Sequence, residues 1–168
     1  MLRAAGIVAL IVLTACGQNN PMSVSSPSPV IAAGNWTQNL TFSGGVVGQM
    51  TGIVADTGDQ VSACTGSKTR NGEQWADTFY ATVGANPQVW EIGFVVNNFR
   101  GAGTYRTTDA TIAVRSLDKK KVWLNISRDK ITFTLGANQQ SGTLDASLTD
   151  AGTGKPGLKV TGQWNCQG

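Results

Sequence analysis

Residues 131–148 have the sequence ITFTLGANQQSGTLDASL, and this stretch decides the fold class. Apolar side chains recur in it at every second position on both sides of a central Gly-Ala-Asn break. They are Ile131, Phe133 and Leu135 before the break and Leu144, Ala146 and Leu148 after it. A period of two is typical of β-strands with one buried face, and Gly and Asn favour turns. The stretch therefore predicts two strands separated by a turn.

The same alternation continues through most of the chain from Gly34 onward. Apolar faces with a period of two, separated by breaks rich in Gly, Asn or Asp, lie in residues 36–42, 90–96, 111–114, 122–126 and 158–166. After residue 16, no segment keeps a helical period over three turns. The pattern predicts an all-β domain over residues 34–168. We expect an antiparallel β-sandwich of about nine or ten short strands, with a partly open β-barrel as the alternative.

The composition excludes several classes of protein and site. The chain has 168 residues with 21 Gly, 14% charged residues and no His. Without His it can form neither a Ser-His-Asp triad nor a His-ligated zinc or haem site. The Gly residues follow no three-residue period, which argues against collagen. A net charge of +3 is too small to indicate a nucleic-acid partner.

The first sixteen residues have the features of an export signal. Arg3 precedes an apolar run, Ala4 to Leu13, which spans only about 15 Å as a helix and is too short to cross a bilayer. Leu13-Thr14-Ala15-Cys16 resembles the bacterial lipobox. The resemblance implies that residues 1–15 are a lipoprotein signal peptide and that Cys16 becomes a lipid-modified N-terminus carrying fatty acyl chains such as palmitate. The alternative is an ordinary signal peptide with an accidental Cys.

Residues 16–33 are predicted to form a disordered tether. The stretch from Gly17 to Ala33 contains three of the five prolines, four serines and no charged residue, so it cannot bury enough surface to offset its ordering entropy. An edge strand at residues 30–32 is the alternative. Gly17 directly after Cys16 resembles an outer-membrane sorting signal. We therefore expect the protein to be exported and lipid-anchored to the bacterial cell envelope, at the outer membrane or the cell surface.

Cys64 and Cys166 remain once Cys16 is acylated. An even number of cysteines in an exported chain predicts a disulfide, and two buried free thiols are the alternative. The bond would close a loop of about 100 residues and contribute about 4–5 kcal/mol in the chain-entropy model. Cys166 shares an apolar face with Trp164, whereas Cys64 alternates with Val61 and Ala63. The bond therefore needs a bulge or strand end at Cys64, or lies at the rim.

Candidate catalytic groups are few. Two pairs among the ten carboxylates lie close in sequence: Asp56 with Asp59 at a Thr-Gly turn, and Glu73 with Asp77 on either side of Trp75. Asp beside Gly is typical of turns, and the chain has no Gly-rich phosphate loop, G-x-S-x-G elbow or C-x-x-C pair. We therefore expect no catalytic residue, no metal site, no cofactor and no enzymatic activity.

A basic run lies at a predicted hairpin tip. Lys119, Lys120 and Lys121 follow Leu117-Asp118. They form either a solvated turn that blocks edge pairing or a patch that touches anionic headgroups or cell-wall polymers.

Three aromatic residues do not follow the apolar faces of their strands. Trp123 and Tyr80 have the opposite parity to their apolar neighbours, and Trp75 lies in a polar stretch. Exposed aromatic side chains on a β face can stack on sugars or anchor a protein partner. Trp75, Tyr80 and Trp123 are therefore predicted to form a ligand platform, unless the core buries both parities at these places.

Several short motifs, in their order, resemble a pattern in uncharacterised small exported bacterial lipoproteins. The matching pieces are residues 42–45 with Gly48, Cys64, residues 101–105, residues 141–148 and residues 160–166. The layout of the two cysteines is also similar to that of mycobacterial lipoprotein antigens. The resemblance implies a shared β fold and an inter-strand disulfide, and it implies no activity.

Together these patterns predict a non-catalytic binding or envelope-interaction module. It would be a monomer held at a membrane by its N-terminal lipid, with an envelope polymer or a protein as partner. One alternative is a carrier of a small apolar or amphiphilic ligand in an inter-sheet cavity. The other is a carboxylate-based hydrolase, which needs two converging Asp or Glu side chains.

Overall fold

The computed structural model describes residues 37–50, 53, 63–64 and 74–165. The predicted signal peptide, the lipidation site Cys16, the tether and Cys166 lie outside the described residues. Cys64 is described only in its backbone. The predicted disulfide therefore stays a prediction.

The described residues are all-β, which confirms the predicted fold class. They form eleven antiparallel strands in one sheet, compared with about nine or ten predicted. The strands are β1 (Thr37–Gly44), β2 (Gly48–Met50), β3 (Ala63–Cys64), β4 (Trp75–Val83), β5 (Asn86–Val96), β6 (Gly103–Arg106), β7 (Ala110–Ser116), β8 (Val122–Leu124), β9 (Ile131–Leu135), β10 (Ser141–Asp150) and β11 (Pro156–Asn165).

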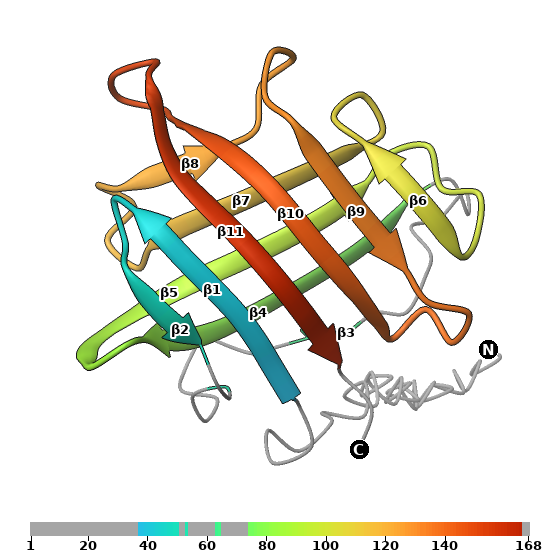
Figure 1. The fold of residues 1–168 in the computed structure, drawn as a ribbon, viewed down its shortest axis with the longest axis horizontal. Coiled ribbons are helices and arrows are strands. Elements are labelled where there is room, and N and C mark those ends of the chain that lie inside the picture. The colour runs from blue at the N-terminus through green and yellow to red at the C-terminus, as the bar shows by residue number, and fades with distance from the viewer. Residues whose placement is uncertain (1–36, 51–52, 54–62, 65–73, 166–168) are drawn as a thin grey trace, which may run out of the picture.

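The sheet folds over into two crossing layers (Figure 1). The front layer contains β2, β1, β11, β10, β9 and β6, and the back layer contains β8, β7, β5, β4 and β3. Where the two ends of the strand order approach each other, the Gly84 N–H donates to the Gln49 carbonyl at 3.0 Å and links the end of β4 to β2. The sheet is therefore nearly closed, and both the predicted sandwich and a partly open barrel fit it.

Strand β10 belongs to both layers. Its first half, Gly142 to Ala146, pairs with β9, and its last residues, Thr149 and Asp150, pair with β8. The register against β11 shifts between Leu148 and Thr149. Such an irregularity bends a strand and increases its twist, so β10 leaves the front layer at this point and continues along the back one.

An aromatic cluster fills the space between the layers. Trp75 and Phe94 from the back layer contact Phe133 and Trp164 from the front layer, with ring centroids 5.3–6.0 Å apart. Each of the four side chains is at most 1% exposed. Burial of an aromatic ring of this kind contributes about 2–3 kcal/mol, so the cluster is a main source of stability.

The predicted apolar face of β8 is wrong. The alternation placed Val122, Leu124 and Ile126 inward, but Trp123 and Asn125 are buried and the three aliphatic residues are only half-buried. Two contacts explain the inversion. Trp123 packs against Trp90 with ring centroids 5.6 Å apart. The Asn125 amide accepts from the Ile112 N–H at 2.6 Å and donates to the Ala110 carbonyl at 2.9 Å, so its polar atoms are satisfied inside.

Candidate functional site: a polar face of the front layer

A row of uncharged polar side chains crosses the outer face of the front layer. Gln163 of β11 lies opposite Asn39 of β1 on one side and Thr143 of β10 on the other, and Thr143 lies opposite Thr134 of β9. We call Asn39, Gln163, Thr143 and Thr134 the polar row. Outward residues on neighbouring strands are about 5 Å apart, so the row presents four hydrogen-bonding groups in line.

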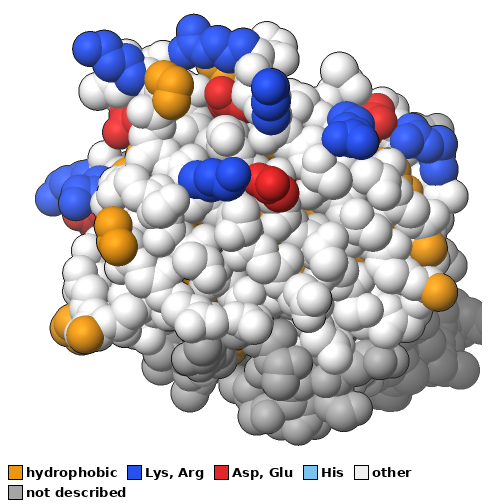
Figure 2. Space-filling model, in the orientation of Figure 1, with side chains coloured by type: hydrophobic (Ala, Val, Ile, Leu, Met, Phe, Trp, Pro, Cys, Tyr) orange, Lys and Arg blue, Asp and Glu red, His pale blue; other side chains and the backbone are white. Residues whose placement is uncertain are grey.

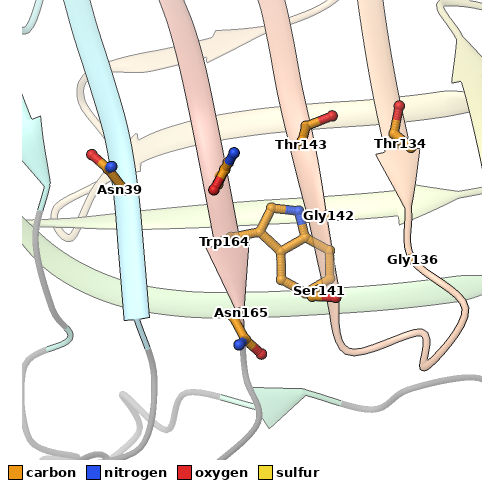
Figure 3. Close-up of a pocket in the computed structure, with 9 residues that line it drawn as sticks. Asn39, Thr134, Gly136, Ser141, Gly142, Thr143, Trp164 and Asn165 are labelled. Carbon is orange, nitrogen blue, oxygen red and sulfur yellow. The ribbon is translucent and has the colours of Figure 1, made fainter.

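The polar row lines a depression of about 490 Å³ (Figure 3). Its remaining lining residues are Gly136, Ser141, Gly142, Trp164 and Asn165. Among the described residues, no charged side chain lines it. Asn39 accepts from the Gln49 side chain, and the Thr134 hydroxyl bonds to that of Thr104. Thr143 and Gln163 are exposed and make no side-chain hydrogen bond with any described residue, so their donors and acceptors are available to a ligand.

Gly142 is required beneath the polar row because β9, β10 and Trp164 meet there. A Cβ at Gly142 would collide with the Thr134 backbone oxygen and lie 3.0 Å from Trp164 Nε1. The indole is stacked on Phe133 at 6.0 Å, and its Nε1 is buried without a hydrogen-bond partner among the described residues. Gly at this position therefore lets the indole lie across β10 and the three strands approach closely.

A second depression, of about 460 Å³, lies farther along the same face and is charged. Its lining includes three cationic side chains, Arg106, Lys130 and Lys159, and two carboxylates, Asp129 and Asp145. Figure 2 shows the change across the face: the lower half carries almost no charge, whereas Lys, Arg, Asp and Glu side chains lie across the middle and the upper edge. The two depressions therefore present different chemistry on one surface.

A buried carboxylate lies inside the fold. Asp77 of β4 is on the inner face between Trp75 and Phe79, its backbone opposite Phe94 on one side and Cys64 on the other. It is 2% exposed, and neither carboxylate oxygen has a hydrogen-bond partner of normal geometry within the part of the chain that the structure describes. Burial raises the pKa of Asp77 well above its ordinary value, and the nearby Thr78 backbone amide lowers the pKa only in part.

No family model matches the chain, and neither the curated proteins nor the solved structures include a similar one. The chemistry of the described residues alone must therefore support a function. Within that part of the chain, no group of three or more Cys, Asp and Glu side chains could hold a metal ion. The described residues also contain no helix with the length and apolar character needed to cross a membrane.

The predicted aromatic platform is wrong for Trp75 and Trp123. Trp75 is fully buried and donates its Nε1–H to the Gln139 carbonyl at 3.2 Å, and Trp123 is 4% exposed. Tyr80 is half-buried on the outer side of β4. The space between the two layers also holds aromatic side chains that do not follow the apolar alternation of their strands. Trp75, Tyr80 and Trp123 therefore form no shared exposed surface.

The predicted hairpin tip at Lys119 is confirmed. Residues 117–121 join β7 to β8, and Lys119, Lys120 and Lys121 are exposed. Asp118 organises the turn by accepting from Ser116 Oγ at 2.6 Å and from the Lys120 N–H at 3.1 Å. The Ser116 hydroxyl is the main group that lowers the pKa of Asp118. These hydrogen bonds stabilise the turn. Contact between the three lysines and an anionic surface stays a prediction.

Proposed function

We propose that the protein is an exported, lipid-anchored envelope protein whose β domain is a non-catalytic binding module for a polyhydroxylated polymer, a glycan of the cell envelope. The polar row carries this proposal. It presents amide and hydroxyl groups in register across four strands, and the described residues that line its open depression are all uncharged.

Amide and hydroxyl side chains match the hydroxyl groups of sugars because each can both donate and accept. A hydrogen bond between uncharged groups contributes only about 0.5–1.5 kcal/mol net. A single sugar would therefore bind the polar row weakly. A polymer that contacts several side chains along the face, and several protein copies anchored at one membrane, gain affinity through effective concentration.

The filled interior favours surface binding over the alternative of an apolar carrier. Trp75, Phe94, Phe133 and Trp164 contact one another across the space between the layers. A ligand at this place would have to displace rings that are already packed at contact distance.

The placement of the carboxylates favours binding over hydrolysis. Four described carboxylates form ion pairs: Glu91, Asp109, Asp118 and Asp145. The oxygens of Asp129 accept from Thr149 Oγ1 and the Ile126 N–H, and Asp150 accepts from the backbone of its turn. Each of these groups therefore has a structural role.

Sedimentation of the full chain with purified peptidoglycan sacculi of the native host tests the proposal. The variant Gln163→Ala/Thr143→Ala removes the centre of the polar row, and Gln88→Ala/Thr82→Ala removes the same side-chain types from the back layer. We expect the first variant to bind at least fivefold more weakly and the second to bind like the wild type. Equal binding by all three proteins, or no binding by any, would overturn the proposal.

A further inference from the structure

We propose that the bound polymer is acidic and that Arg106 and Lys130 bind its anionic groups in the second depression. This inference rests on the proposed function and specifies the class of ligand. It stands on three observations: the placement of the two cations, the net positive charge of the depression that they line, and the closeness of this depression to the polar row.

Arg106 and Lys130 are neighbours on the outer face. Arg106 of β6 lies opposite Thr132 of β9, and Lys130 comes two residues before Thr132. The two cations are therefore diagonal neighbours, and a ligand bound to one is within reach of the other. A hydrogen bond positions the Arg106 side chain, because its guanidinium donates to Thr132 Oγ1 at 2.9 Å. At Lys130 the bond fixes the backbone: its carbonyl accepts from the Ser147 N–H at 3.0 Å.

Two of the other charges of the depression form an ion pair, since Lys159 Nζ lies 3.4 Å from Asp145 Oδ1. Asp129 accepts hydrogen bonds from the Ile126 N–H and Thr149 Oγ1, which are uncharged donors, so it keeps its negative charge. Arg106 and Lys130 form no ion pair with any residue in the described part of the chain, and together with Asp129 they leave the depression with a net positive charge. A guanidinium beside an ammonium favours a carboxylate or a phosphate.

The two depressions are neighbours along the strands. Thr134 and Thr143 of the polar row are each two residues from Thr132 and Asp145, which line the second depression. Two residues of a strand span about 7 Å, so one short segment of polymer can contact both places. A ligand with hydroxyl groups and an acidic group on the same chain matches this order of side chains.

Chemically treated sacculi identify the anionic group. Amidation of their carboxyl groups removes the carboxylate charge, and treatment with hydrofluoric acid removes phosphate-linked polymers. The variant Arg106→Gln/Lys130→Gln removes the two cations, and the control Arg115→Gln/Lys155→Gln removes one Arg and one Lys that line neither depression. Binding is measured by sedimentation of the full chain at low salt, because exposed charge pairs are screened at high salt.

We expect one of the two treatments to weaken wild-type binding about tenfold, and the treatment that does so names the group as carboxylate or phosphate. Arg106→Gln/Lys130→Gln should show the same loss on untreated sacculi and no further loss after treatment, while Arg115→Gln/Lys155→Gln binds like the wild type. Undiminished wild-type binding after both treatments, or undiminished binding by Arg106→Gln/Lys130→Gln, would overturn the inference. If Gln163→Ala/Thr143→Ala still loses binding, the proposed function survives that result.

Discussion

The buried carboxyl of Asp77 makes a defined prediction about stability and pH. Neither of its oxygens has a hydrogen-bond partner of normal geometry among the described residues, and it lies between Trp75 and Phe79 on the inner face of β4. The raised pKa means that the folded protein keeps this proton at pH values where the unfolded chain, with an ordinary pKa of 3.8, has released it. Stability from this group is therefore complete below about pH 4 and is lost as the pH rises through the folded pKa.

The size of this pH effect follows from the number of bound protons, because the folded protein holds one proton more than the unfolded chain. Between the two pKa values, the free energy of unfolding should fall by about 1.4 kcal/mol per pH unit because of Asp77 alone. Asp77→Asn places a neutral amide at the same position and abolishes this slope. Below pH 4 the two proteins differ only by the exchange of one neutral polar group for another, whereas at neutral pH the variant should be the more stable protein.

Urea unfolding of both proteins, followed by Trp fluorescence from pH 4 to pH 8, measures the effect. The difference between the two free energies isolates Asp77, because Asp109 and Asp118, whose pKa values are lowered, contribute equally to both curves. A difference that is constant with pH, or one that favours the wild type as the pH rises, would refute the reasoning.

Three further perturbations test other parts of the structure. Gly142→Ala should destabilise the protein by about 2–3 kcal/mol in urea unfolding because its Cβ meets the backbone of β9, whereas Gly93→Ala, with 3.8 Å to its nearest neighbour, should change stability by less than about 0.5 kcal/mol. Asn125→Leu should cost roughly 2–4 kcal/mol in the same assay because it leaves two backbone groups of β7 unpaired; an unchanged midpoint would contradict this. Cys16→Ser should move the protein from the membrane fraction to the soluble fraction on cell fractionation, and unchanged fractionation would count against lipidation.

The sequence predicts strands well where one face is purely apolar. In β9 and β10 every residue predicted to point inward is buried. The other face of these strands carries polar residues such as Thr, Ser and Asp, so the apolar face is the one that packs in the core. The prediction fails where an aromatic or amide side chain can be satisfied inside. Trp123 and Asn125 invert the face of β8 for this reason, and Asp77 occupies a core position that alternation alone assigns to an apolar residue.

The candidate site could be predicted only in part. Alternation already places Gln163, Thr143 and Thr134 on outward faces. Their alignment in one row depends on pairing between segments far apart in the chain: Asn39 lies opposite Gln163, and a shift by one residue would have turned it inward. The sequence contains no local signal for that register, since it is set by the packing of the two layers and by the bend of β10.

The position of β11 has a consequence for how the protein folds. This strand is the last of the eleven along the chain, yet it lies in the front layer between β1 and β10 and pairs with both. During synthesis β1 can therefore pair with β2, but its other edge has no partner until more than a hundred further residues have followed. Contacts of such long sequence separation slow folding and leave a strand edge exposed in the meantime. We expect refolding to be slow, with β1 unprotected until β11 docks, and holdase chaperones to bind the chain at this stage.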